Sequence, residues 1–257
     1  MSDAAGRLVS FGNAFLLGRN EGDSQAEAAV SRGIARWRFD TLLPRRYGIA
    51  PVRTVARSPF AWFRWLRAHG YRRLTLMVLT AAEYSALDGP LKVFTTTERG
   101  RMIVAEHERE LPMLWNVWRT RDRTGWRSPC AAEVEYRGSD VYVLPPREAV
   151  DTDALVARFD AVLAEAGALR PADAPAFAQA RAALVAPEPE TMLAPAELPM
   201  LAPSTHPIVA RRLMAAVILV HRVADAYREW RIGRTLRPAA FWPTLSDAFL
   251  AAVNSLT

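Results

Sequence analysis

The chain has 257 residues, a formal net charge of +6 at pH 7 and 51% hydrophobic residues, which is the composition of a globular protein of one large or two small domains. Its single cysteine, Cys130, excludes an internal disulfide and a cysteine-rich metal site. The N-terminus lacks a secretory pattern, and the apolar run 213–220 is far shorter than the ~20 residues of a membrane span. We therefore expect a cytoplasmic protein with no membrane association, no metal and no other cofactor.

Basic residues are unevenly placed along the chain. Residues 1–147 carry a net charge of +8, residues 148–200 carry −6, and residues 201–257 carry +4. All 33 basic residues except Lys92 are arginines. GC-rich codon usage is one interpretation of that ratio, but it does not explain why eleven arginines, eight aromatic residues and only one acid fall between Arg32 and Arg73. A basic segment interleaved with aromatic rings is typical of proteins that bind single-stranded nucleic acid.

Hydrophobic periodicity and turn residues predict strands and helices in the first half of the chain. The apolar run 8–17 is predicted as a strand, and Asp23 is predicted to cap a helix that reaches Trp37. The segment 40–57 is expected to be irregular. A helix over 58–69 has the clearest signals, because Ser58 is a good N-cap, Pro59 fits the first turn and Gly70 ends it. Further strands are expected at 74–79, 92–97, 102–106, 131–136 and 141–144. Hairpin turns are expected at 98–101 and at 137–140.

The remainder of the chain has a helical pattern. Helices are predicted from Leu155 to Gly167, from Asp173 to Leu184, from Pro207 to about residue 230, and from Leu245 to Val253 after a Thr244–Asp247 capping box. Five prolines near 187–204 predict a stiff, exposed connector. The predicted class is α+β, and the predicted parts are a basic α+β domain (1–148), an acidic helical segment (149–186), a Pro-rich linker (187–204) and C-terminal helices (205–257).

Catalytic and cofactor motifs are largely missing from the sequence. Residues 18–22 lack the Lys-Ser/Thr of a phosphate-binding loop, and residues 107–111 lack the second histidine of a zinc-protease helix. The four histidines are too scattered to form a metal site. His69 has two interpretations: a proton carrier among arginines, or a helix-terminal residue that satisfies free carbonyls. The tryptophans likewise are either a stacking platform for bases or ordinary core residues.

These observations favour RNA as the partner. Interleaved aromatic residues favour single strands or hairpin loops over duplex DNA, and no predicted helix resembles a major-groove reader. The residues expected to bind RNA are Arg19, Arg32, Arg45, Arg46, Arg53, Arg57, Arg64, Arg67, Arg72, Arg73 and Arg234.

Three segments resemble a known family. IARWR at 34–38, FTTTERGR at 94–101 and RIGRTLR at 231–237 resemble the CRISPR-associated subunits that process repeat RNA, especially the arginine-rich endonucleases of type IV systems. The chain departs from that family in lacking its C-terminal glycine-rich loop, since only Gly233 lies beyond residue 167. The resemblance implies a ferredoxin- or RRM-like fold in the N-terminal half and a place in an antiviral ribonucleoprotein with other subunits.

The resemblance also implies a reaction. Cleavage would be metal-independent and would proceed by attack of a 2′-hydroxyl. Arg36, Arg38 and Arg237 would then stabilise the pentavalent phosphate, and His69 would move protons. Two other classes of function stay open. One is a non-catalytic scaffold whose basic face meets an acidic protein, and the other is an enzyme that holds a small anionic substrate with arginines.

Overall fold

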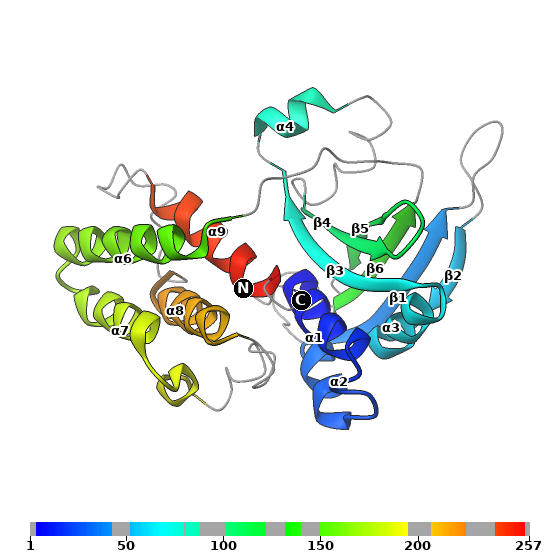
Figure 1. The fold of residues 1–257 in the computed structure, drawn as a ribbon, viewed down its shortest axis with the longest axis horizontal. Helices are drawn as coiled ribbons and strands as arrows, with labels where there is room; N and C mark the ends of the chain where they lie inside the picture. Colours follow the sequence, from blue (N-terminus) through cyan, green and yellow to red (C-terminus); the bar gives the residue numbers. More distant parts are fainter. Residues whose placement is uncertain are drawn as a thin grey trace. The chain divides into compact units, whose positions relative to one another are not determined.

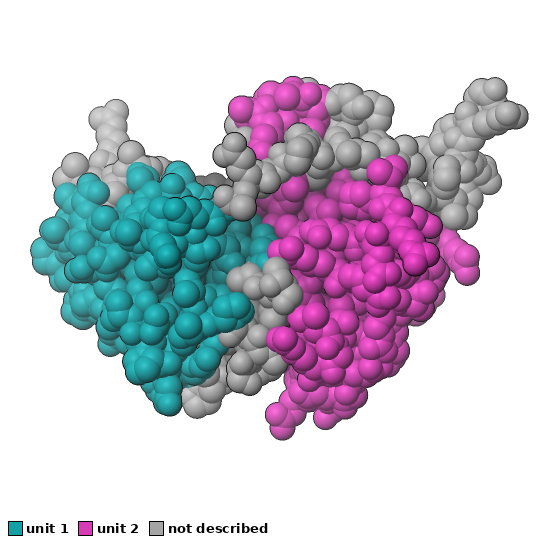
Figure 2. Space-filling model, viewed as in Figure 1, with its two compact units in different colours: residues 1, 147–256 teal, residues 2–146, 257 magenta. Residues whose placement is uncertain are grey.

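The structure is a computed structural model, and it describes residues 4–42, 52–79, 81–87, 101–121, 132–139, 150–194, 207–224 and 240–254. Helices and strands are mixed along this part of the chain, which confirms the general α+β class. The chain divides into two compact units, residues 2–146 and residues 147–256, coloured magenta and teal in Figure 2. We call them the sheet unit and the helical unit and describe each by itself.

The sheet unit contains one six-stranded sheet. Its elements in chain order are α1 (Ala4–Leu16), α2 (Ser24–Ser31), β1 (Ile34–Leu42), β2 (Val52–Ala56), α3 (Pro59–Ala68), β3 (Tyr71–Val78), α4 (Ala81–Ala86), β4 (Arg101–His107), β5 (Met113–Arg121) and β6 (Ala132–Ser139) (Figure 1). The strand order is β2-β1-β6-β5-β4-β3, and every neighbouring pair is antiparallel except β1 and β6. This described order differs from the β-α-β-β-α-β order of a ferredoxin-like fold, so the finer prediction is not confirmed.

Stacked aromatic rings fill the core between α3 and the first face of the sheet. Phe39 of β1 lies parallel to Trp62 of α3, with 4.6 Å between ring centroids, and Trp62 meets Trp115 of β5 edge-on at 5.2 Å. All three side chains are fully buried. A Cβ on Gly138 of β6 would lie 2.7 Å from the Trp115 ring, so the ring covers the bare backbone there. Trp62 and Trp115 are therefore ordinary core residues, and they do not form a stacking platform for bases.

Helix α1 packs against the edge strand β3 through a glycine and an asparagine. A Cβ on Gly12 would lie 2.5 Å from Leu74 Cδ1 and 2.8 Å from Phe63 Cε1, so the close approach of the helix requires glycine. Beside it, the buried Asn13 side chain pairs with the backbone of Leu74. Its Oδ1 accepts the Leu74 N–H at 2.7 Å, and its Nδ2 donates to the Leu74 carbonyl at 2.8 Å. The amide thus replaces the neighbouring strand that an edge lacks.

The second face of the sheet carries a smaller apolar cluster over β3, β4 and β5. The buried members are Leu79, Met102, Val104 and Leu114, and Met77, Tyr84 and Leu87 pack on them. Tyr84 belongs to α4, so this short helix covers the second face as α1 and α3 cover the first.

Several predicted elements of the first half need correction. The run 8–17 is part of helix α1, whose residues 5–15 are all buried. Polar residues recur there at the three-residue spacing of a helix (Arg7, Ser10 and Asn13), which the strand prediction overlooked. The helix capped by Asp23 ends at Ser31, and Trp37 lies in β1. The segment 40–57 includes the end of β1 and all of β2. The predicted turn at 137–140 is wrong, because β6 continues through Ser139.

Other predictions for the sheet unit are confirmed. Ser58 caps α3 by accepting the Ala61 N–H at 3.3 Å, and Gly70 follows the helix with φ of 83°. The predicted strands at 74–79, 102–106 and 131–136 coincide closely with β3, β4 and β6. The predictions at 92–97 and 141–144 lie outside the described residues, as does most of the turn at 98–101.

The helical unit contains α6 (Thr152–Leu169), α7 (Ala174–Val185), the 3₁₀ turn η2 (Pro189–Met192), α8 (Ile208–Ala224) and α9 (Phe241–Asn254). Residues 213–220 of α8 are all buried, and this helix packs against α7, α9 and η2. Gly167 does not end α6, which continues to Leu169. Helix α9 begins before the predicted capping box, because the Thr244 N–H already donates to the Ala240 carbonyl at 3.0 Å. The predicted extension of α8 to residue 230 lies outside the described residues.

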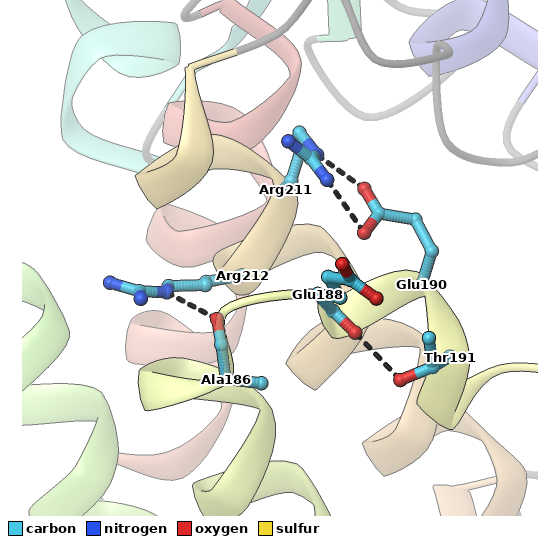
Figure 3. A network of polar contacts seen from close by, with 6 residues as sticks. All are labelled: Ala186, Glu188, Glu190, Thr191, Arg211 and Arg212. Carbon is cyan, nitrogen blue, oxygen red and sulfur yellow. Dashed lines mark hydrogen bonds and ion pairs between the residues drawn. The ribbon is translucent and has the colours of Figure 1, made fainter.

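The Pro-rich segment is not an extended connector where the structure describes it. Residues 189–192 form η2, and a set of polar contacts fastens this turn and the residue after α7 to helix α8 (Figure 3). Arg211 binds Glu190 with Nε and Nη2, the latter at 2.7 Å from Oε2, and Arg212 Nε donates to the Ala186 carbonyl at 2.7 Å. Pro189 is buried. Prolines prevent an α-helix here, but they do not prevent packing. Residues 195–206 lie outside the described residues.

Removal of the Asn13 amide should destabilise the sheet unit strongly. Asn13→Leu leaves a buried N–H and a buried carbonyl of Leu74 without partners, at a cost of about 2–3 kcal/mol. Asn13→Asp keeps an acceptor for the Leu74 N–H, but it loses the donor and buries a carboxylate against the Leu74 carbonyl, so at neutral pH it should cost at least as much as Asn13→Leu. Urea denaturation followed by tryptophan fluorescence checks this order. Equal stability of wild type and Asn13→Leu would contradict the role given to this side chain.

The Glu190–Arg211 ion pair predicts a pH dependence. The hydrogen bond from Arg211 lowers the pKa of Glu190, so the stabilisation is present at neutral pH and is lost as the pH falls below about 4. Glu190→Gln should therefore lower the free energy of unfolding by about 0.5–1 kcal/mol at neutral pH. The difference from wild type should vanish at about pH 3. Thermal unfolding of both proteins at the two pH values measures it, and a difference that does not change with pH would contradict the assignment.

Candidate nucleic-acid interface

Three of the arginines predicted to bind RNA or to act in catalysis are held in ion pairs with acids. Arg67 at the end of α3 donates to both carboxylate oxygens of Glu21, with Nη1–Oε2 at 2.8 Å and Nη2–Oε1 at 2.5 Å. Its guanidinium carbon also lies 4.9 Å from the centroid of the Phe15 ring. The hydrogen bond lowers the pKa of Glu21 and raises that of Arg67. Arg67 therefore fastens α3 to the segment that follows α1.

Arg72 and Arg38 form the other two ion pairs. Arg72 Nε lies 2.7 Å from Glu108 Oε1, and this hydrogen bond lowers the pKa of Glu108. Both side chains are about half exposed, so the pair contributes little stability. Arg38 Nε lies 3.0 Å from Oδ1 and 2.9 Å from Oδ2 of Asp40. Here the carboxylate is fully buried while the arginine side chain is 50% exposed.

A second set of arginines is exposed and has no ion pair among the described residues. Arg53 lies in β2, Arg57 follows that strand, and Arg64 lies on α3. The sequence has no acidic residue from 41 to 82, although Glu21 pairs with Arg67 of α3 and also lies within electrostatic reach of Arg64. Strand β2 is an edge strand of the sheet (Figure 1). Charged side chains on an edge also prevent pairing with another sheet, and that is the structural alternative for Arg53 and Arg57.

Strand register places the arginines of β1 beside glutamates. In the parallel pair of β1 with β6, Arg36 is in register with Glu133 and Arg38 with Glu135. In the antiparallel pair of β5 with β6, the same two glutamates are in register with Arg121 and Arg119. Arginine and glutamate positions therefore alternate across the three strands in the backbone register.

His69 is placed away from the arginines of β1. It ends α3, its Nδ1 lies 2.7 Å from the Trp65 carbonyl oxygen, and its ring stacks on Trp65 at 4.2 Å. This is the contact expected of a helix-terminal histidine. Because Trp37 and Phe39 point from β1 into the core on the α3 side, Arg36 and Arg38 belong to the opposite face. The structure therefore does not bring together His69 and the arginines that were expected to share a catalytic site with it.

The remaining predicted residues are scattered or lie outside the description. Arg19 is exposed after α1, Arg32 is exposed at the end of α2, and Arg73 is half-buried in β3. Arg45, Arg46, Arg234 and Arg237 lie outside the described residues.

Two functional or structural residues were missed by the sequence analysis. Asp40 was noted only as the single acid of its segment, although an acid that alternates with apolar residues in a strand is itself a signal of a buried partner. Arg7 is 6% exposed within α1. Its Nη1 donates to the carbonyls of Ala29 at 3.1 Å and Arg32 at 2.8 Å, which satisfies the C-terminal end of α2. An arginine inside an apolar run was the available signal for that contact.

Metal and membrane features were also searched for in the part of the chain that the structure describes. There, no three histidine, cysteine or acidic side chains are grouped so as to hold a metal ion. No helix in that part is long and apolar enough to cross a membrane. No family model, no curated protein and no solved structure matches the chain. The geometry of the arginines is therefore the feature of the chain that bears on its function.

The Arg67–Glu21 pair predicts coupled effects on stability. Arg67→Ala and Glu21→Ala should each lower the melting temperature of the sheet unit, with the larger loss for Arg67→Ala because that change also removes the contact with Phe15. The double variant should be little less stable than Arg67→Ala alone, since both changes break the same bond. Differential scanning calorimetry measures the cycle. Strictly additive losses would show that the two side chains do not interact in solution.

Proposed function

We propose that the sheet unit binds single-stranded or hairpin RNA through the exposed arginines of β2 and α3, Arg53, Arg57 and Arg64. The observation that carries the proposal is their exposure without an ion pair among the described residues, in a segment with no acid from 41 to 82. Guanidinium groups bind phosphate through paired N–H donors and are always charged. A surface of this kind binds a phosphate backbone with little sequence preference.

The contribution of aromatic residues to this proposal is narrower than the sequence suggested. Trp37, Phe39 and Trp62 are buried and are not available to bases. The partly buried Trp65 and the exposed His69 stacked on it lie at the end of α3, the helix that carries Arg64. A flat ring beside arginines offers an unpaired base a stacking surface, which favours single-stranded RNA over a duplex.

The resemblance to CRISPR repeat-RNA-processing subunits supplies a candidate ligand, which is a hairpin derived from a repeat RNA. The proposal also includes a ferredoxin-like fold relationship and an assembly with other subunits. We restrict the activity to binding. Cleavage would need a proton carrier beside the phosphate-binding arginines, and His69 lies across the sheet from Arg36 and Arg38. The competing function, a scaffold for an acidic protein, makes the opposite prediction in the experiment below.

Fluorescence anisotropy with a labelled hairpin RNA and a labelled uridine octamer tests RNA binding. Wild-type affinity should fall steeply with salt. The triple variant Arg53→Ala/Arg57→Ala/Arg64→Ala should bind at least about tenfold more weakly at low salt, and the slope of log K against log salt should shrink by about 2. The physical reason is the loss of three phosphate contacts and of the counterions that they release.

The matched control removes the same charge elsewhere. Arg109, Arg158 and Arg181 are exposed, and none of them was predicted to bind RNA. Their triple alanine variant should keep at least about half of the wild-type affinity, apart from the general effect of net charge. Equal losses in the two triple variants would contradict a localised interface. Tighter binding of a poly-glutamate peptide than of either RNA would favour the scaffold function instead.

A further inference from the structure

We infer that Arg38 and Arg57 form a two-guanidinium site for one phosphate group at the end of the β1–β2 pair, with the buried Asp40 as the residue that positions Arg38. This inference rests on the proposed function and deepens it, since it names a phosphodiester of the RNA backbone as the ligand. It also gives Arg38 a role in binding that differs from the catalytic role expected from the sequence.

Register places the two arginines side by side. Phe39 of β1 is paired with Ala56 of β2 in an antiparallel ladder. Arg38 directly precedes Phe39, and Arg57 directly follows Ala56, so the two arginines are the next positions at that end of the pair. Phe39 and Ala56 are buried on the α3 side. Side chains alternate along a strand, so Arg38 lies on the second face. Arg57 directly follows the last residue of β2, and both arginines are exposed.

Asp40 fixes one end of the Arg38 side chain and leaves the other end open. Only Nε of Arg38 contacts the carboxylate, at 3.0 Å from Oδ1 and 2.9 Å from Oδ2. The carboxylate is fully buried and the arginine is 50% exposed, so the fixed end lies inside and the charged fork lies towards solvent. Within the described part of the chain, the Nη1 and Nη2 groups have no other partner. An arginine held in this way loses little side-chain entropy when a phosphate binds.

The charges around the pair point to an anion that is supplied from outside. Like charges at neighbouring positions of a sheet are unfavourable. Asp40 already pairs with Arg38, whereas no acid pairs with Arg57 among the described residues. Glu135 is in register with Arg38 on the β6 side, whereas β2 has no strand beyond it in the described sheet. A phosphate that approaches over β2 would meet both guanidinium groups and would remove their repulsion.

Equilibrium binding of a uridine octamer with a 5′-hydroxyl tests the site. Arg38→Ala and Arg57→Ala should each weaken binding about five- to tenfold and reduce the salt slope by less than about 1, because they share one phosphate. Arg57→Lys should also weaken binding, since a lysine keeps the charge and loses the fork. Arg109→Ala, an exposed arginine of the same unit, should bind like wild type.

The Asp40→Asn variant distinguishes the positioning of Arg38 by Asp40 from the effect of net charge on RNA binding. The change makes the protein more positive, so electrostatics alone predicts tighter binding of RNA. Positioning predicts weaker binding, by about threefold or more, because Arg38 is no longer held by a carboxylate. The ¹⁵N-edited signal of the Arg38 Nε–H reports the contact directly. It should be sharp and shifted in wild type, shift again on addition of inorganic phosphate or the octamer, and broaden in Asp40→Asn.

The outcomes distinguish this inference from the proposed function. If wild type fails to bind either RNA, the proposed function is wrong and this inference falls with it. In a second case, wild type binds RNA and the Arg53/Arg57/Arg64 variant binds it more weakly. If Arg38→Ala and Asp40→Asn then bind like wild type or more tightly, only this inference is overturned. If the octamer with a 5′-phosphate bound fivefold more tightly than the octamer with a 5′-hydroxyl, the ligand of the site would be a terminal phosphate and not a phosphodiester. Tighter binding of poly-glutamate than of the octamer would overturn the phosphate site. If Asp40→Asn does not fold, as judged by circular dichroism, Arg38→Ala and Arg57→Lys decide.

Discussion

The pairing of the Asn13 amide with the backbone of Leu74 is the interaction on which the sheet unit depends. A sheet has two edges with unpaired backbone groups. At the β3 edge, the side chain of Asn13 supplies both a donor and an acceptor at 2.8 and 2.7 Å. This contact, together with the close approach at Gly12, fixes α1 over the first face. The opposite edge strand, β2, has no described strand beyond it, and the exposed Arg53 and Arg57 lie on it and directly after it.

Arginine serves several physical purposes in this chain. Arg7 is buried and caps the end of α2, and Arg67 joins α3 to Glu21. In the helical unit, Arg211 fastens the η2 turn to α8 through Glu190. An arginine can bind an external phosphate only through exposed N–H groups that no acid already occupies. The count of arginines in the segment 32–73 therefore overstated the size of the proposed interface, while the lack of acids after Asp40 suggested its location.

The acidic block of the chain is largely used within the helical unit. Asp160 of α6 binds Arg181 of α7 at 2.7 Å, which lowers the pKa of Asp160. Asp247 of α9 binds Arg158 of α6 at 2.7 Å. These pairs join the helices α6, α7 and α9 around the buried α8. Within the acidic block, Asp160, Asp173 and Glu190 therefore have local arginine partners.

The sequence by itself determined those features that depend on local chemistry. The cap at Ser58, the stop at Gly70 and the strand at 74–79 follow from residues within one turn or one strand, and the acid-free segment is visible without any structure. Tertiary structure decided the rest. Helix α1 is buried along its whole length, and the strand register alone places Glu133 beside Arg36 and Ala56 beside Phe39. Whether an arginine is paired or available depends on residues as distant in sequence as Glu21 is from Arg67, since charges interact through space and local patterns do not record such neighbours.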